Sequence, residues 1–367
     1  MSNIRNIDRY QRFLITGGAG FIGRKLTLQL AKNLENRIWI IDNLSPQIHG
    51  EDIQEPIFPS NITFIRGDVK NQNLVEKIIQ DAQPEVIVHM AAETGTGQSM
   101  YEITRYCDVN ILGTSILLEA INKHGNNLKR FVLPSSRAIY GEGAYREWET
   151  RKLIVPPART NEAMQSGQFI PTSSNGIQLE PIATLEDTPP APCSIYASTK
   201  LMQEYLVTQA AANASWQATI LRFQNVYGPG QSLNNPYTGV LSIFSSQILQ
   251  NKKLNIYEDG NIVRDFIFID DVARAVELAT QARLPHGTTI NIGSGEPTTI
   301  LEVAKTLLNL HEKPENNYQI TGDFRTGDIR HAVADISKAN ELLNWQPQVS
   351  LKQGLSALSF WCKKNIV

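Results

Sequence analysis

Short apolar runs recur along the first 223 residues, and segments with helical periodicity lie between them. The runs predict buried strands at FLIT (13–16), RIWIID (37–42), ITFIRGD (62–68), EVIVHMAA (85–92), RFVLPSS (130–136) and QATILRF (217–223). Helices are predicted after the glycines that follow the first run, at NLVEKIIQDA (73–82), at about 101–123 and at 193–211. Because the strands are continuously apolar rather than alternating, the pattern predicts an α/β fold whose doubly wound parallel sheet is covered on both faces.

The pattern changes twice. Residues 141–192 are rich in Pro, Thr, Ser and Asn and show no period, which predicts an insertion without regular elements after the fifth strand. The remainder is mixed: predicted helices at about 238–250, 270–282 and 299–310, strands at 264–269 and 288–293, and two short helices at the end. We therefore expect a dinucleotide-binding domain over 1–223 and a smaller α/β lobe over 224–367, with some segments of the lobe returning to the first domain.

Composition excludes several classes of function but does not identify one. The chain has 367 residues and a formal net charge of −2, so there is no basic excess to bind a nucleic-acid backbone. Its apolar runs are too short to cross a bilayer, and its N-terminus lacks the apolar core of a secretory signal. The three cysteines, Cys107, Cys193 and Cys362, form neither a metal pair nor a disulfide framework. These features predict a cytoplasmic enzyme with reduced thiols and no metal.

A glycine-rich loop follows the first strand. TGGAGFIG supplies Gly17, Gly20 and Gly23, whose backbone can approach a pyrophosphate closely at the N-terminus of the next helix. The bare motif also suits a strand–helix turn without a ligand. The acid that binds an adenosine ribose is expected ~20 residues further on, and Asp42 stands there, followed by Asn43 rather than a basic residue. A carboxylate repels a 2′-phosphate, so the loop favours NAD over NADP and a Rossmann arrangement.

Two tyrosines are candidates for a general base. A tyrosine serves as a base near neutral pH only if its pKa falls well below about 10, and a nearby cation lowers it. Lys200 follows Tyr196 by one helical turn in YASTK, whereas Tyr140 in SSRAIYGE has no cation at that spacing. We therefore predict that Tyr196 is the base and that Tyr140 is a wall of the pocket.

Taken together, the motifs resemble those of the extended short-chain dehydrogenases/reductases, the nucleotide-sugar epimerase and dehydratase family. The matching segments span nearly the whole chain: TGGAGFIG, DNLS, GDV, HMAAET, VNILGT, SSRAIYG, YASTK, RFQNVYGPGQ, VRDFIFIDDVARA, NIGSGEPTTI, RTGDIRHAVADISKA and LLNWQP. The resemblance implies a homodimer, bound NAD, a nucleotide-diphosphate sugar as substrate, and a catalytic set of Ser136, Tyr196 and Lys200.

The resemblance also assigns binding residues. Those implied for NAD are Gly17, Gly20, Phe21, Ile22, Gly23, Asp42, Asn43, Asp68, Val69, Ala91, Ala92, Asn110, Ser135, Tyr196 and Lys200. Those implied for the substrate are Thr94, Ser136, Asn225, Arg264, Arg325 and Asp328. Guanidinium groups suit phosphate oxygens, which agrees with a diphosphate beside the two arginines.

Within the family, AAETGTGQSMYE, SSRAIYGEG and the long insertion most resemble dTDP-L-rhamnose 4-epimerases, which interconvert dTDP-L-rhamnose and dTDP-6-deoxy-L-talose. Many of those carry a Cys-x-x-Cys-like element in the insertion, where this chain has Ser173, Ser174, Asn175 and Gly176. The 4,6-dehydratases place an Asp–Glu pair after their catalytic Thr. This chain has Arg137 and Ala138 there, which disfavours elimination.

Four alternatives remain open: a UDP-hexose 4-epimerase, a UDP-uronate 4-epimerase, an NADH-dependent reductase of 4-keto sugars, and a non-enzymatic NAD-sensing scaffold.

Overall fold

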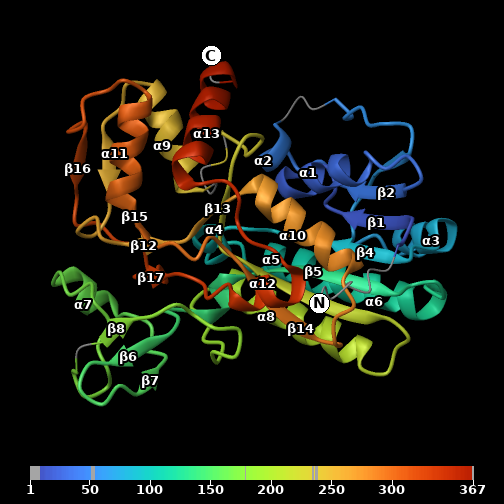
Figure 1. Cartoon of the computed structure of the whole chain (residues 1–367), viewed down its shortest axis with the longest axis horizontal. Coiled ribbons are helices and arrows are strands. Elements are labelled where there is room, and N and C mark those ends of the chain that lie inside the picture. Colours follow the sequence, from blue (N-terminus) through green and yellow to red (C-terminus); the bar gives the residue numbers. More distant parts are fainter. Residues whose placement is uncertain (1–8, 51–53, 178, 234, 236–238, 366–367) are drawn as a thin grey trace, which may run out of the picture.

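The computed structural model describes residues 9–50, 54–177, 179–233, 235 and 239–365. Its centre is a seven-stranded sheet in the order β14-β9-β5-β4-β1-β2-β3, in which every neighbouring pair is parallel (Figure 1). The strands are β1 Arg12–Thr16, β2 Arg37–Asp42, β3 Ile62–Arg66, β4 Val86–His89, β5 Arg130–Ser136, β9 Gln217–Phe223 and β14 Thr288–Ile292. The predicted parallel α/β fold is confirmed, and β14 from the C-terminal third adds a seventh strand.

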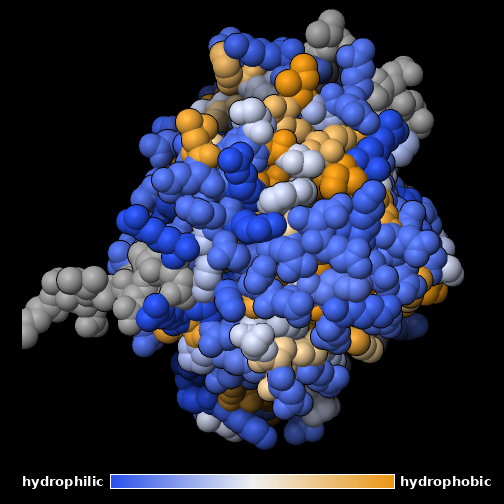
Figure 2. Space-filling view, turned by 90° about the vertical axis from the view of Figure 1, so that its right-hand side faces the viewer, coloured by the Kyte–Doolittle hydropathy of each residue, from blue (hydrophilic) through white to orange (hydrophobic). Residues whose placement is uncertain are grey.

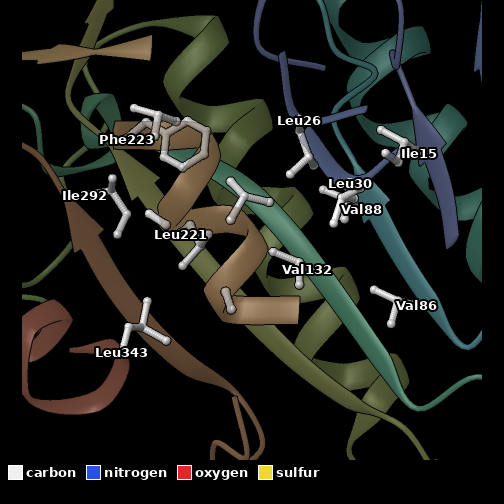
Figure 3. Packing of buried hydrophobic residues seen from close by; sticks show 14 of the residues in the cluster. Ile15, Leu26, Leu30, Val86, Val88, Val132, Leu221, Phe223, Ile292 and Leu343 are labelled. Carbon is white, nitrogen blue, oxygen red and sulfur yellow. The ribbon is translucent and has the colours of Figure 1, made fainter. Parts of the chain in front are cut away.

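Helices cover both faces because successive side chains of each strand point to opposite sides. On one face, Ile15, Val88 and Val132 pack against Leu26 and Leu30 (Figure 3). The helices of that face are α1 Phe21–Leu30, α10 Ile269–Gln281 and α12 Ser337–Leu343. The opposite face holds α3 Gln72–Ala82, α6 Gly113–His124 and α8 Ile195–Ala211.

The helix predicted over 101–123 is not uniform. It consists of α5 Ile103–Tyr106, a π-helical turn η1 Cys107–Leu112 and then α6, and a short helix α4 Thr96–Ser99 precedes it. The π segment contains Asn110, whose side chain accepts a hydrogen bond from the backbone N–H of Glu93 (2.8 Å). Single π turns recur at functional sites, and this one connects the helix to the loop that follows β4.

The insertion contains regular elements, so the prediction of a segment without them is wrong. After the 3-10 turn η2 Arg137–Tyr140, it forms the antiparallel sheet β7-β6-β8 and the helix α7 Asn161–Gln165. The strands are β6 Tyr145–Glu147, β7 Leu153–Ile154 and β8 Leu179–Pro181. Figure 1 shows this subdomain as a separate green unit beside β17, away from the main sheet. Strands of two or three residues are too short to produce a detectable period.

Apart from α10, β14 and α12, most of the chain beyond β9 builds a lobe with its own apolar core. Its helices are α9 Val240–Leu249, α11 Ile300–Leu310 and α13 Leu351–Asn365, the last longer than predicted. The predicted start of α9 at about 238 lies outside the described residues. The strands of the lobe are β10 Asn225–Tyr227, β11 Leu254–Ile256, β12 Val263–Arg264, β13 Phe266–Phe268, β15 Thr298–Thr299, β16 Tyr318–Ile320 and β17 His331–Ala332.

The molecular surface seen in Figure 2 is mainly hydrophilic, and its hydrophobic side chains are more frequent in the upper half of that view, with others in the lower half. Scattered exposed apolar residues are ordinary on folded proteins and need no partner to explain them. Among the residues described, no helix has both the length and the apolar character needed to cross a membrane.

Candidate active site at the carboxyl edge of the sheet

The glycine-rich loop joins β1 to α1. Gly17 has φ +68°, a conformation that favours glycine, and a Cβ at Gly23 would collide with the carbonyl oxygen of Gly17. Helix α1 has no side-chain cap at Gly20 and no acidic residue in its first turn. Its first N–H groups therefore face the adjacent cavity and are suited to an anion such as a pyrophosphate.

Asp42 ends β2 beside this loop. Its carboxylate accepts hydrogen bonds from the backbone N–H groups of Ala19 (3.0 Å) and Leu44 (2.9 Å), and His49 lies 3.7 Å away. Burial alone would raise the pKa of Asp42, but the nearby His49 side chain and the hydrogen bonds from the two backbone groups hold it below its ordinary value. A fixed, ionised carboxylate thus lies at the edge of the cavity, suited to ribose hydroxyls.

A cavity of about 380 Å³ runs along the carboxyl ends of β1, β2, β4 and β5. Open α/β sheets bind ligands at this edge. Of the predicted residues, it is lined by Gly17, Gly20, Phe21, Ile22, Gly23, Asp42, Asn43, Asp68, Val69, Ala91, Ala92, Thr94, Ser135, Ser136, Tyr196 and Lys200. The structure also places there several residues that the sequence analysis missed, among them Gln47, His49, Glu93, Gln224 and Gln231.

The predicted catalytic side chains meet at one end of this cavity. Ser194 caps α8 by accepting a hydrogen bond from Ala197 N–H (3.2 Å), which places Tyr196 in the first turn. Ser136, at the end of β5, shares a hydrogen bond with the Tyr196 hydroxyl. Lys200 lies one turn further along α8 and donates to the carbonyl oxygen of Pro134 (2.7 Å). Ser136, Tyr196 and Lys200 are therefore brought together as predicted.

The electrostatics of the base differ from the prediction. Burial raises the pKa of Tyr196 above its ordinary value, while the hydrogen bond from Ser136 and the positive charge of Arg137 act to lower it. Burial also lowers the pKa of Lys200 to about 8, against the opposing effect of Glu204. In the structure, the cation that favours the tyrosinate is Arg137, whereas the sequence analysis assigned this effect to Lys200.

A buried polar cluster supports the site from behind. Glu204 accepts hydrogen bonds from Ser135 and, through both oxygens, from Arg222. Arg222 also donates to the Tyr140 hydroxyl (2.7 Å), which in turn donates to Asn291 (2.8 Å). The hydroxyl of Tyr140 is thus held in this cluster and Tyr140 does not line the cavity, so its predicted role as a pocket wall is wrong.

Two predicted cofactor residues contribute in ways that the motifs did not show. The hydroxyl of Ser135 is engaged by Glu204, so what Ser135 offers the cavity is its backbone edge. Asn110 is fully buried and does not line the cavity, and its amide donates to Glu93 O (3.1 Å) and Thr199 Oγ1 (2.9 Å). It joins the loop after β4 to α8, the helix that carries Tyr196.

Of the predicted substrate residues, Thr94 and Ser136 line the cavity, and four others lie outside it. Arg264 on β12 forms a 2.6 Å ion pair with Asp328. Arg325 lies over the Tyr257 ring, 5.1 Å from its centroid. Asn225 begins β10, paired with Phe266 of β13. None of the four lines the cavity described above, so the structure groups Arg264 with Asp328 but does not bring all four into one pocket.

Arg137 lies between the catalytic side chains and the Arg264–Asp328 ion pair. Its charge acts on Tyr196 on one side and on Arg264 and Asp328 on the other. Burial and the like charge of Arg264 lower its pKa to about 10, and within the described part of the chain its guanidinium donates no hydrogen bond. Arg137 is thus a cation with unused donors, where the dehydratases carry an acid.

Comparison with known proteins places this site in a family. The NAD dependent epimerase/dehydratase family matches residues 13–165 and 158–293. The chain belongs to this family. It is 40% identical to the dTDP-L-rhamnose 4-epimerase of Burkholderia thailandensis over 357 residues, covering 97% of this chain and 96% of that protein. Its cofactor is NAD.

Solved structures show the same fold. The UDP-glucose 4-epimerase of Thermotoga maritima with UDP-glucose is 30% identical with a TM-score of 0.78, covering 97% of this chain and 99% of that one. The UDP-glucuronic acid 4-epimerase of Bacillus cereus, in complex with UDP-glucuronic acid and NAD, is 31% identical with a TM-score of 0.77 and covers 96% and 99%. This family member therefore shares its architecture with epimerases over nearly its full length.

The cavity suits NAD on its own chemistry. The uncapped N-terminus of α1 and the glycines of the loop fit a pyrophosphate, and Asp42 fits the ribose hydroxyls. Lys200 and Tyr196 lie at the opposite end, where a nicotinamide would be placed against a reacting carbon.

Proposed function

We propose that this chain, an NAD-dependent nucleotide-sugar 4-epimerase, inverts C4 of dTDP-L-rhamnose to give dTDP-6-deoxy-L-talose. The observation that carries the proposal is the Ser136–Tyr196–Lys200 group at the end of an NAD cavity, next to Arg137 and Ala138 rather than an elimination acid. The B. thailandensis relative supports the choice of sugar nucleotide.

Tyr196, Ser136 and Lys200 have separate roles in the inversion of C4. Bound NAD⁺ supplies the acceptor, and afterwards the donor, of the hydride of C4. Tyr196, as the phenolate, takes the proton of the C4 hydroxyl and returns it, while Ser136 holds that oxygen by a hydrogen bond. Lys200 holds the nicotinamide ribose. The 4-keto sugar turns in the pocket between the two transfers, so hydride returns to the opposite face and no net oxidation occurs.

The charged side chains near the cavity are assigned to the nucleotide diphosphate of the substrate. In this proposal, Arg264 and Arg325 bind the diphosphate with Asn225, and Asp328 binds the nucleotide ribose. Thr94 contacts the sugar, and the remote nucleotide contacts retain the keto intermediate while the sugar turns.

A second candidate is a 4-epimerase of UDP-sugars. A UDP-glucuronate 4-epimerase of Thermodesulfobacterium geofontis is 29% identical over 359 residues, and the two solved structures above also hold UDP-sugars. The two candidates share the chemistry at C4 and differ in the nucleotide and the sugar.

The test is a panel of dTDP-, UDP-, GDP- and CDP-sugars incubated with the purified protein without added cofactor and followed by proton NMR. We expect inversion at C4 of dTDP-L-rhamnose, and a rate at least about 100-fold lower in Tyr196→Phe, since general acid–base catalysis contributes about 10²–10⁴. Conversion of UDP-sugars alone would establish the second candidate. A requirement for stoichiometric NADH would overturn epimerisation in favour of reduction.

A further inference from the structure

A buried arginine of the insertion contacts the loop that carries Asp328. Arg159 lies between β7 and α7, and its side chain is 3% exposed. Its Nη2 donates to the backbone carbonyl oxygen of Asp328 (3.0 Å), the residue whose carboxylate pairs with Arg264. Arg159 thus contacts the proposed nucleotide side from outside the cavity.

The other donors of Arg159 reach two carboxylates from distant parts of the chain. Nε donates to Glu142 (2.9 Å), just beyond η2, and Nη1 donates to Glu258 (2.8 Å). Both carboxylates also bind Arg330: Glu142 accepts from its backbone N–H (2.8 Å) and Glu258 from its guanidinium (2.9 Å). A buried ion cluster therefore joins the insertion to Glu258 and to the chain from Asp328 to Arg330.

Two further contacts hold the same loop, one against the insertion and one against the chain that follows it. Thr326 donates to the side chain of Asn161 at the start of α7 (3.0 Å). Gly327, with φ +78°, lies so close to the chain before α8 that a Cβ would stand 2.9 Å from Cys193 O. The loop of residues 325–330 thus contacts the insertion at Thr326, Asp328 and Arg330.

We infer that the insertion serves substrate binding, and that Arg159 is a positioning residue that holds the 325–330 loop in place for the nucleotide diphosphate. This inference rests on the proposed function. Arg159 does not touch the reacting atoms. It orders Asp328 and Arg264 before substrate arrives, so the binding energy of the nucleotide is not spent on ordering the loop.

The test measures binding of dTDP to the NAD-loaded protein by calorimetry, beside KM and kcat. Arg159→Lys keeps the charge but loses the planar fork that reaches Glu142, Glu258 and Asp328 together. We expect dTDP affinity to fall about tenfold or more and KM to rise in proportion, with kcat within about threefold, since loss of a hydrogen bond to a charged group costs about that much. NAD content stays unchanged because Arg159 is remote from the cofactor loop.

A second, milder variant tests the same role in case Arg159→Lys does not fold. Asn161→Ala removes only the exposed contact to Thr326, and we expect a smaller loss of dTDP affinity in the same direction. The matched control is Arg151→Met, which removes an exposed ion pair to Glu180 within the same insertion and leaves affinity within about twofold.

The outcomes separate the two proposals. Wild-type affinity for dTDP in both Arg159→Lys and Asn161→Ala overturns the positioning role while leaving the proposed function standing. A wild-type protein that binds neither dTDP nor UDP overturns the proposed function, and this inference with it. A fall in kcat at constant KM would assign Arg159 to catalysis instead.

Discussion

At the scale of single residues, the site is governed by which charges surround Tyr196. Its pKa is raised by burial, and Ser136 and Arg137 oppose that effect. Lys200 is held against the backbone of β5 by its bond to Pro134. The replacement of an acid by Arg137 therefore has two consequences: it removes the group needed for elimination, and it supplies a cation that favours the tyrosinate.

Removal of that cation is expected to shift the pH dependence of epimerisation. The base works as the phenolate, so activity rises with pH through the pKa of Tyr196. Arg137→Met raises that pKa, so the acid limb of the kcat/KM profile moves to higher pH and activity falls more at pH 7 than at pH 9. Arg137→Lys restores part of the shift, and Arg151→Met serves as the control. An unchanged acid limb in Arg137→Met would show that Arg137 does not influence the base.

At the scale of elements, β4 is joined to its neighbours through a buried histidine. His89 lies between Thr16 of β1 (Nδ1 to Oγ1, 2.7 Å) and Thr114 of α6 (Nε2 to Oγ1, 2.9 Å). The Thr114 hydroxyl donates to Asn110 O (2.6 Å), so it accepts from the imidazole, and the neutral ring carries its proton on Nε2. Burial, together with the positive charge of Lys200, lowers the pKa of His89 to about 3.

This histidine predicts loss of stability in acid. An unfolded histidine titrates near 6.5, so between about pH 6.5 and 3 the unfolded chain binds one more proton at this position than the folded one. The free energy of unfolding therefore falls as pH decreases through that window, by at most about 1.4 kcal/mol per pH unit for this group. We expect a shallower fall in His89→Gln, measured by urea denaturation from pH 6.5 to 4.5. Parallel curves for the two proteins would contradict this account.

Elements were predictable from the sequence where they are long and locally patterned. Strands β1–β5 and β9 are continuous apolar runs, and α3 and α8 were recognised as helices, so each was found. The attachment of β14 to β9 was not, because pairing between distant strands leaves no local signal. The insertion was predicted but its strands were not, because they are too short to produce a period. The role of Arg159 was missed because it arises only where Glu142, Glu258 and Asp328 converge on that residue.

At the scale of the whole molecule, large apolar side chains are exposed on adjoining helices. They are Ile103 of α5, Leu112 of η1, and Met202 and Tyr205 of α8. Helix α5 and the π-helical turn η1 both pack against α8, so these side chains come from neighbouring elements. Exposed apolar residues grouped in this way mark a surface that associates with another chain.

We predict that this surface forms a homodimer. Sedimentation should give about twice the chain mass of 41.0 kDa for the wild type. Tyr205→Asp together with Met202→Asp should give a monomer that retains NAD, because two charges oppose burial of the surface. Phe360→Asp on α13, exposed elsewhere, is the control and should leave the mass unchanged. A wild-type protein that sediments as a single chain would refute the prediction.

The insertion leaves and rejoins the body of the protein at nearly the same point. Ala191 N donates to Ile139 O (2.8 Å), and a Cβ on Gly141 would collide with the carbonyl oxygen of Ala191. Since the entropic cost of closing a loop grows only slowly with its length, evolution can lengthen, shorten or exchange this segment as a cassette while the sheet and catalytic helix stay intact. An insertion of another length must still provide a guanidinium at the position of Arg159. The length of the insertion can therefore vary, whereas this one residue cannot.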